Sequence, residues 1–346
     1  MSEYLKYYEG KRALITGGAG AVGSVLVRKL LELNCQVVVI DNLSSGYVWN
    51  LPAHDQKLLF VKGDIRNEVD LKRVFNEEPQ VIFHLAAFFA NQNSVDYPEE
   101  DLNTNGLGTL RLLQYIALYG KIERVVYASS GCSIYPSDAP LPYKEELGAS
   151  MYLTTPYQIT KMLGELYLNY FYKMKEMPIS KARFFNSYGA GEVPGQYRNV
   201  IPNFIYWAMG KNPLPITGTG EETRDFTYVG DIVDGLLRMG YFKEAIGEAF
   251  NLAAGREIRI IDLAQMVNRL VGNDAGVKYL ARRKWDTKTR LLACNEKAKK
   301  VLGFNPMLDF EFGVKEAIAW FRENSENINK SAQFGPGASS AVRPVK

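Results

Sequence analysis

The segment Thr16-Gly17-Gly18-Ala19-Gly20-Ala21-Val22-Gly23 lies between a short apolar run and a stretch, Val22–Leu33, with the pattern of a helix. A glycine-rich turn in this position can bind the pyrophosphate of a dinucleotide, because the start of a helix offers free backbone N–H groups. We expect Gly17 to form the tight turn, Gly20 to let the backbone approach the phosphates, and Gly23 to let helix and strand pack closely. A plain loop is the alternative, because such a motif alone is a weak signal.

Apolar runs rich in Val, Ile and Leu alternate with helical stretches through the first half of the chain. The predicted strands are Arg12–Thr16, Gln36–Ile40, Leu58–Lys62, Val81–Leu85, Arg124–Ala128 and Ser180–Phe184. The predicted helices are Val22–Leu33, Thr104–Tyr119 and Pro156–Tyr172, with Ile261–Val271 and Phe312–Glu323 later in the chain. Strands of this composition joined by helices indicate a buried parallel sheet. We therefore predict an α/β fold with a Rossmann-type doubly wound parallel sheet and a smaller C-terminal substrate-binding lobe.

The domain organisation follows from where this alternation stops. We assign residues 10–188 to the dinucleotide-binding Rossmann domain, with a later segment near 224–255 returning to it. Glycine and proline interrupt the pattern after about residue 186, so residues 189–325 mainly form the substrate lobe. Residues 326–346 are rich in Gly, Ser, Ala and Pro toward their end, and we predict a disordered tail there.

Composition excludes several classes of protein. The 346 residues carry a net charge of +3 with mixed signs, which predicts no nucleic-acid partner. No stretch approaches 18 apolar residues, so we predict no membrane span. Three scattered cysteines suggest reduced thiols in a cytoplasmic protein. Two histidines without metal-ligand spacing argue against both a metal site and a Ser-His-Asp relay, so no metal is predicted.

A carboxylate ends the second predicted strand and indicates which dinucleotide binds. Asp41 lies 18 residues after Gly23, where it can accept hydrogen bonds from the adenosine ribose and repel a 2′-phosphate. No arginine follows Asp41, which favours NAD over NADP; a role in a strand-end turn is the alternative. We interpret His84 as a buried structural histidine rather than a catalytic one. The other predicted cofactor-binding residues lie in the glycine turn or near strand ends: Ala21, Val22, Asn42, Ser44, Gly46, Asp64, Ile65, Leu85, Ala86, Ala87 and Phe184.

A tyrosine and a lysine at helical spacing are the candidate catalytic pair. Tyr157 and Lys161 are four residues apart, so they share one helix face. A nearby ammonium favours tyrosinate and is expected to lower the tyrosine pKa, so that the phenol can act as acid or base. Ser129 and Ser130 follow the preceding strand, where a hydroxyl can share a hydrogen bond with the substrate oxygen. The alternatives are an accidental pair on a helix surface and ordinary loop serines.

These motifs, together with Asn105-Gly106-Leu107-Gly108-Thr109, resemble the extended short-chain dehydrogenase/reductase family over roughly residues 10–320. Two further segments, Arg183–Gly189 and Arg224–Val229, are similar to that family's nucleotide-sugar epimerases and dehydratases. The resemblance implies an NAD-dependent enzyme whose substrate is a sugar linked to a nucleoside diphosphate, favouring UDP.

The resemblance also implies roles for single residues. Tyr157 would be the acid and base, Lys161 would bind the nicotinamide ribose, and Ser130 would hydrogen-bond the reacting sugar oxygen. Asn105 would support the surroundings of Lys161 and contact the cofactor. The implied substrate-binding residues are Asn186, Asn199, Arg224, Arg283 and Asp286. The last two belong to Arg282-Arg283-Lys284-Trp285-Asp286, in which tryptophan departs from the family's usual glycine.

The reaction predicted from this resemblance is epimerisation at C4 through a transient 4-keto sugar. Related dehydratases and decarboxylases carry an acidic residue after the fifth strand, whereas this chain has Ser130-Gly131-Cys132-Ser133-Ile134-Tyr135. A 4-epimerase needs no additional group, and it regenerates NAD in each turnover.

Other functions remain open, and one of them is another nucleotide-sugar dehydratase or reductase. The Cys132 segment is also similar to that of GDP-mannose 3,5-epimerases, although Val193–Arg198 contains no lysine to match their proton-transferring one. A catalytically inactive NAD-binding regulatory protein is an alternative of a different class. The family's dimers pack two helices from each subunit, so we also predict a homodimer through Thr104–Tyr119 and Pro156–Tyr172, whose apolar positions include Leu107, Leu110, Leu113, Leu163, Leu166 and Tyr170.

Overall fold

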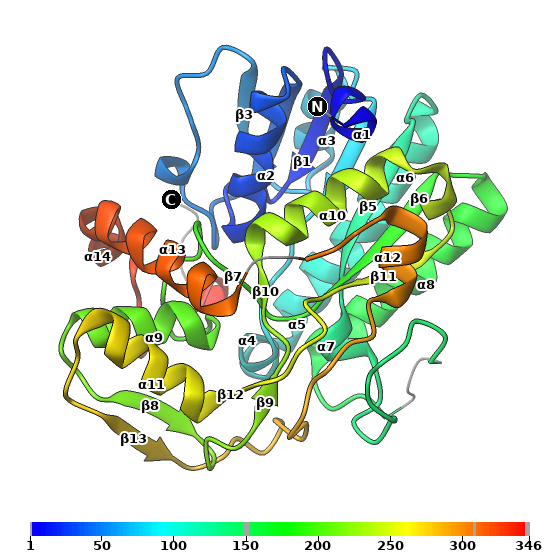
Figure 1. Cartoon of the computed structure of the whole chain (residues 1–346). Helices are drawn as coiled ribbons and strands as arrows, with labels where there is room; N and C mark the ends of the chain where they lie inside the picture. Colours follow the sequence, from blue (N-terminus) through cyan, green and yellow to red (C-terminus); the bar gives the residue numbers. More distant parts are fainter. Residues whose placement is uncertain (1, 148–151, 307–308, 343–346) are drawn as a thin grey trace.

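The computed structural model describes residues 2–147, 152–306 and 309–342, and a seven-stranded parallel sheet lies at its centre (Figure 1). The strands are β1 Arg12–Thr16, β2 Gln36–Asp41, β3 Leu58–Lys62, β4 Val81–His84, β5 Arg124–Ser130, β6 Ile179–Phe184 and β11 Ala249–Leu252. Their order is β11-β6-β5-β4-β1-β2-β3, so the winding direction changes between β1 and β4. Ligands bind at the carboxyl ends of strands beside such a switch point. The predicted Rossmann-type sheet is confirmed, with β11 as a further strand.

Helices cover both faces of the sheet, and apart from the edge strand β3 its strands are mostly buried, which explains the apolar runs. In β1, Ala13 and Ile15 pack into the core on one face, and Leu14 packs into the core on the other. Helices α2 (Ala21–Glu32) and α10 (Val229–Tyr241) cover the first face. Helices α3 (Glu68–Phe75), α6 (Thr109–Tyr119) and α8 (Pro156–Lys175) cover the second. Because successive side chains of a strand point to opposite faces, the chain fills both layers at once.

The remaining elements around this sheet are short. They are α1 Glu3–Lys6, α4 Asn91–Asp96, α5 Pro98–Asp101, α7 Gly131–Ile134 and α12 Glu296–Leu302, with single 3-10 turns at Val48–Asn50, Lys243–Ala245 and Ser340–Val342. The predicted helix 104–119 is regular only from residue 109, because residues Leu102–Gly108 form a π-helix. Asn105 lies in this wider segment, and its side chain is buried.

A second lobe lies beside the carboxyl ends of the strands (Figure 1). It contains α9 Val200–Met209, α11 Ile260–Val271, α13 Phe310–Glu323 and α14 Ser325–Ser331, with the parallel pair β8 Leu214–Thr217 and β13 Val277–Leu280. Helices α9, α11 and α13 share one apolar core that contains Phe204, Leu263 and Phe310. Two further strand pairs are short: β7 Ser187–Tyr188 pairs with β10 Thr227–Tyr228, and β9 Thr223–Arg224 pairs with β12 Ile258–Arg259. The chain then returns to the central sheet, because residues 229–252 contain α10, which covers one face of it, and its edge strand β11.

The disorder predicted for residues 326–346 is wrong for the part of that segment that the structure describes, which ends at residue 342. Helix α14 covers Ser325–Ser331, and the backbone N–H of Gln196 donates to the carbonyl of Gln333 at 2.8 Å. Phe334 stacks against Tyr206 at a centroid distance of 5.6 Å. The tail itself is poor in apolar residues, but α9 and the loop before it provide the contacts that order this segment.

No helix among the described residues is long and apolar enough to cross a bilayer. In the same part of the chain, no group of three or more His, Cys, Asp or Glu side chains is arranged to hold a metal ion.

Candidate active site

A cavity of about 680 Å³ opens between the carboxyl ends of the strands and the second lobe. Its walls come from the glycine turn, from the ends of β2, β4, β5 and β6, from the start of α8, and from the segments 192–204 and 283–291. The site therefore lies at the switch point of the sheet, where a doubly wound fold binds its ligands.

The glycine turn has the shape that a bound pyrophosphate requires. Gly17 has a φ of +72°, and a Cβ there would lie 2.7 Å from the backbone of Ala86. A Cβ on Gly23 would lie 2.3 Å from the carbonyl oxygen of Gly17, so the helix can approach the strand only without a side chain. Gly20 is the N-cap of α2, whose first N–H groups have no side-chain cap. The turn thus offers free donors and a smooth backbone surface to an anion.

Asp41 is held beside this turn by two backbone hydrogen bonds. Its carboxylate accepts from the N–H of Ala19 at 2.9 Å and from the N–H of Leu43 at 2.8 Å. Gly46 passes so close that a Cβ would lie 2.9 Å from the carboxylate. Burial raises the pKa of Asp41, while the two N–H donors oppose that shift. Asp41 also lines the cavity, where a fixed carboxylate can accept hydrogen bonds from a ribose diol.

The neighbouring strand end carries a second acidic group with its own cation. Asp64 accepts from the side chain of Asn42 at 2.9 Å and pairs with Arg66 at 2.8 Å. Arg66 also contacts Glu100 at 2.7 Å. The guanidinium is therefore engaged by two carboxylates, which keeps it from serving as a ligand for a 2′-phosphate.

Tyr157 and Lys161 lie where α8 begins, against the end of β5. Thr155 caps the helix, with its hydroxyl accepting from the N–H of Gln158, and Pro156 occupies the first turn. The ammonium of Lys161 donates to the carbonyl of Ala128 at 2.9 Å and lies 5.7 Å from the centre of the Tyr157 ring. The predicted pair therefore shares one face of the helix and points into the cavity.

The electrostatics of the pair differ from the sequence-based expectation, because both groups are buried. The pKa of Tyr157 is raised, first by burial and then by the charge of Asp101, while a hydrogen bond with Ser130 opposes the shift. Burial also lowers the pKa of Lys161 to about 8. The prediction of a lowered tyrosine pKa is thus not met by the protein alone, because burial penalises the charged tyrosinate.

Of the two serines that end β5, Ser130 is the one whose side chain is partly exposed to a substrate. Its hydroxyl donates to Ser133 at 2.9 Å, and its side chain is partly exposed in the cavity wall. The hydroxyl of Ser129 is buried and donates to Glu165 at 2.6 Å, and Glu165 pairs with Arg183 at 2.8 Å. Ser129 therefore anchors the strand end, and Ser130 is the serine that accompanies Tyr157.

Asn105 supports the pair from behind and is not among the residues that line the cavity, so its contact with the cofactor stays a prediction. Its amide accepts from the N–H of Phe88 at 2.8 Å and donates to Asp101 at 2.8 Å. Asp101 also accepts from Thr160, the residue before Lys161, at 2.7 Å. This buried network fixes the first turn of α8.

His84 has the structural role that we interpret from the sequence. Its ring nitrogens hydrogen-bond the hydroxyls of Thr16 at 2.7 Å and of Thr109 at 3.0 Å. Burial lowers its pKa to about 3, so the ring is neutral and ties β1, β4 and α6 together.

All the other predicted cofactor and substrate residues line the same cavity. Arg224 pairs with Asp286 at 3.2 Å, and Arg283 lies 5.5 Å from the ring centre of Trp285. Asn186 donates to the carbonyl of Asp225 at 3.2 Å. Cationic groups from the lobe thus face the glycine turn across the cavity, a suitable setting for a second phosphate-containing ligand.

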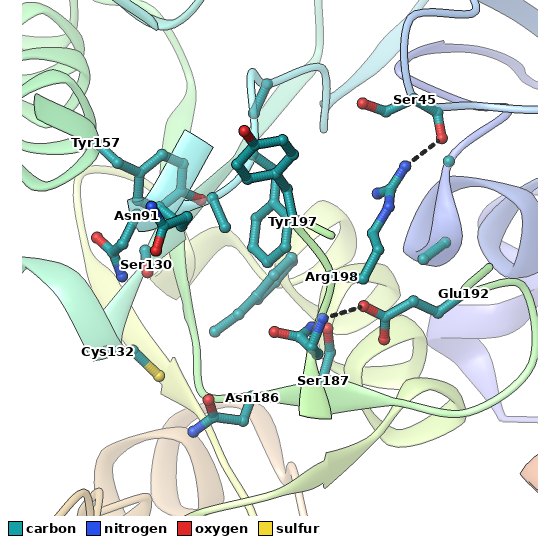
Figure 2. Close-up of a pocket in the computed structure, with 18 of the residues that line it drawn as sticks. Ser45, Asn91, Ser130, Cys132, Tyr157, Asn186, Ser187, Glu192, Tyr197 and Arg198 are labelled. Atoms are coloured by element: carbon teal, nitrogen blue, oxygen red, sulfur yellow. Dashed lines mark hydrogen bonds between the residues drawn. The ribbon is translucent and has the colours of Figure 1, made fainter. Parts of the chain in front are cut away.

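Among the cavity-wall residues that sequence reasoning missed, four bear on the argument: Glu192, Arg198, Lys288 and Phe334. Figure 2 shows Arg198 and Glu192 on one side of the pocket, with Tyr157, Ser130 and Cys132 on the other. Arg198 donates to the carbonyl of Ser45 at 2.9 Å, which joins the lobe to the cofactor side. None of the four belongs to a local motif. The charged residues within 192–198 were the one feature of the sequence that could have indicated a binding site there.

Comparison with known proteins agrees with this geometry. Residues 13–253 match the model of the NAD dependent epimerase/dehydratase family. The chain belongs to this family. It is 34% identical to a UDP-glucose 4-epimerase of Mycolicibacterium smegmatis, over 91% of this chain and 100% of that protein. It is 33% identical to a UDP-glucuronate 4-epimerase of Thermodesulfobacterium geofontis, over 91% of this chain and 97% of that protein.

A solved structure with high similarity is an epimerase from the methanogen Methanothermobacter thermautotrophicus. The two chains are 55% identical, with a TM-score of 0.94 over 96% of this chain and 98% of the other. The family membership identifies the chain as an NAD-dependent enzyme of the extended short-chain dehydrogenase/reductase group. The glycine turn, Asp41 and Lys161 fit that cofactor, because the turn accepts no Cβ and the carboxylate is fixed beside it.

Proposed function

We propose that this enzyme is a nucleotide-sugar 4-epimerase, with a UDP-sugar as substrate. The observation that carries the proposal is the group at the end of β5 and the start of α8: Tyr157, Ser130 and Lys161 line the same cavity, with the Lys161 ammonium 5.7 Å from the centre of the Tyr157 ring. The UDP-sugar 4-epimerases named above support the choice of substrate class. Asn186, Asn199, Arg224, Arg283 and Asp286 are the residues that we assign to the nucleotide diphosphate.

In the proposed reaction, Tyr157 accepts the proton of the sugar 4-hydroxyl and later returns it to the 4-keto oxygen. Ser130 hydrogen-bonds the same oxygen, and its orientation is set by Ser133. Lys161 would hold the nicotinamide ribose, and its positive charge would favour the tyrosinate form during proton transfer. Bound NAD supplies an acceptor that takes up a hydride and returns it. The sugar must turn over in the cavity between the two transfers, so that the hydride returns to its opposite face.

The wall beside Tyr157 argues against a dehydratase or a decarboxylase. The residues after Ser130 in this wall are Cys132 and Ser133, and neither is an acid. Glu192 lies across the pocket (Figure 2). Elimination of water requires an additional acid and base next to the sugar carbons, and the described residues here offer Cys132 instead.

Cys132 gives a 3,5-epimerase a specific basis as second candidate. Its carbonyl accepts a hydrogen bond from Lys288 at 2.8 Å, so a lysine does lie near it, although not in Val193–Arg198. A catalytically inactive regulatory protein is disfavoured by the assembled Tyr157, Lys161 and Ser130, which a sensor would not need.

Solvent deuterium separates these candidates. Purified enzyme is incubated in D₂O with UDP-, GDP-, CDP- and dTDP-sugars, and the products are followed by NMR. A 4-epimerase returns the substrate's own hydride, so the product carries no carbon-bound deuterium. Deuterium at C3 or C5 would instead identify the 3,5-epimerase, and the absence of any turnover with bound NAD would favour the regulatory protein.

We further propose a homodimer in the cytoplasm. Several apolar side chains of α8 and the segment before α6 remain exposed: Leu107 at 39%, Ile159 at 52%, Leu166 at 57% and Tyr170 at 51%. Leu113, in contrast, is buried within the chain. A partner subunit that packs on this face would cover the exposed set. Cys35, Cys132 and Cys294 are free thiols, which suits a reducing compartment.

A further inference from the structure

Lys288 is a buried cation in the cavity wall that the proposed reaction does not use. It is 8% exposed and lies two residues after Asp286, where the chain passes from the lobe back toward the sheet. Its ammonium donates to the carbonyls of Cys132 at 2.8 Å and of Tyr135 at 2.7 Å. An ammonium has three N–H donors, so these two bonds leave one for a ligand.

The position of those carbonyls places the ammonium at the sugar end of the cavity. Cys132 belongs to α7, which begins directly after Ser130. Ser130 in turn hydrogen-bonds Ser133 of the same turn and lines the cavity together with Tyr157. Lys288 is thus bound to the segment that carries the proposed catalytic serine.

The charge of Lys288 is poorly compensated, unlike that of the other buried cations in the wall. Lys161 has Asp101 and Glu165 nearby to favour its charged form, and Arg224 pairs with Asp286. For Lys288, burial lowers the pKa to about 8, Cys132 opposes the shift, and the charge of Arg224 adds to it. Two neutral carbonyls and the ring of Tyr143, whose centre lies 5.4 Å away, hold the ammonium in place. Among the described residues no carboxylate pairs with it, so an anionic ligand group would supply the charge compensation that these contacts do not.

We propose that Lys288 binds a carboxylate carried by the sugar, so that the preferred substrate is a nucleotide-linked uronate. This inference rests on the proposed 4-epimerase function and narrows its substrate class. One relative described above is a UDP-glucuronate 4-epimerase, which shows that the family includes enzymes for such sugars. The same ammonium could meet the diphosphate instead, and the experiment below separates these two anions.

The test compares UDP-glucuronate with UDP-glucose in the NAD-bound enzyme and in three variants. Lys288→Gln keeps a donor but removes the charge, Lys288→Arg keeps the charge, and Arg290→Gln removes an exposed cation that pairs with Glu257 at 2.5 Å. In the unaltered enzyme, kcat/KM should be about 10- to 100-fold higher for UDP-glucuronate. Lys288→Gln should remove that preference while kcat/KM for UDP-glucose changes less than about threefold. Lys288→Arg should keep part of the preference for UDP-glucuronate, and Arg290→Gln should leave kcat/KM for both sugars unchanged.

Three results would overturn the inference. Equal losses with both sugars, together with weaker binding of UDP alone, would assign Lys288 to the diphosphate. A loss of all activity in both Lys288 variants would indicate a proton-transfer or purely structural role. A preference of the unaltered enzyme for UDP-glucose would refute the uronate while leaving the 4-epimerase intact.

If neither sugar is epimerised, the proposed function fails, and calorimetry decides the inference on its own. UDP-glucuronate should still bind more tightly than UDP-glucose to the unaltered protein. Lys288→Gln should abolish that difference. Equal binding of the two sugars would refute the role of Lys288.

Discussion

Replacing Tyr157 by Phe removes one oxygen atom from the cavity and leaves its supports in place. Lys161 remains bonded to the carbonyl of Ala128 at 2.9 Å, and Ser130 remains oriented by Ser133 at 2.9 Å. The ring keeps its edge contact with Phe89, whose centroid lies 6.0 Å away. The variant should therefore fold and retain NAD, and it should lose only the group that moves the proton.

The expected loss of activity follows from the chemistry of that oxygen. General acid–base groups typically contribute about 10²–10⁴-fold to rate, which corresponds to about 3–5 kcal/mol of barrier. Ser130→Ala should reduce kcat less, and Cys132→Ala least, if the enzyme is a 4-epimerase.

The assay measures isomer formation by NMR and, in parallel, the NAD released on denaturing each variant. Tyr115→Phe is the matched control, because it removes a surface hydroxyl that bonds the carbonyl of Glu68 at 3.2 Å. Retention of more than about a tenth of kcat in Tyr157→Phe would refute the role of the phenol, since it falls short of the general acid–base range. A variant that lost both activity and NAD would show that Tyr157 acts by holding the cofactor. Damage from Cys132→Ala equal to that from Tyr157→Phe would favour the 3,5-epimerase.

Three further predictions concern the cofactor, the stability and the assembly. Asp41→Ala should weaken NAD binding about 10- to 100-fold in calorimetry and relax the preference over NADP; equal affinity of the unaltered protein for both would contradict the assignment. Glu165→Gln should destabilise the protein at pH 7 by about 3–5 kcal/mol in urea unfolding, because it leaves Arg183 buried without its partner. The Glu165 pKa is lowered in the fold, so this contribution is present above the unfolded value of about 4.5 and should shrink as pH falls below it; an unchanged difference at pH 3.5 would argue against the pair. Leu166→Glu should convert the proposed dimer to monomer in light scattering, and a monomeric unaltered protein at micromolar concentration would exclude it.

The sheet and the cofactor end were predictable because their signals are local. A parallel strand buried on both faces is an apolar run, so Arg12–Thr16 is identified with the bounds that β1 has. Asp41 is recognisable because the spacing from the glycine turn is set by one helix and one strand. The seventh strand, β11, was harder to predict from the sequence because a polar residue, Asn251, interrupts its apolar run. The buried amide of Asn251 donates to the carbonyls of Tyr143 and Cys294.

The remaining features depend on contacts between distant segments. Lys288 reaches Cys132 across 156 positions, and no pattern around either residue signals that pairing. The direction of the Tyr157 pKa shift depends on how much water the second lobe excludes, which residue spacing does not reveal. Asn105 belongs to a family motif, but the motif does not reveal that its amide donates to Asp101, four residues earlier, behind the cavity wall.

The contact between Phe334 and the cavity has a consequence for how the protein matures during synthesis. The last strand of the sheet, β11, ends at residue 252, whereas the wall of the cavity includes Phe334. Translation runs from the N-terminus, so the cofactor half can fold while the residues that complete the substrate side are still unmade. A nascent chain would thus be able to bind its dinucleotide before its sugar site is complete. Catalytic activity would then require the last residues to be synthesised.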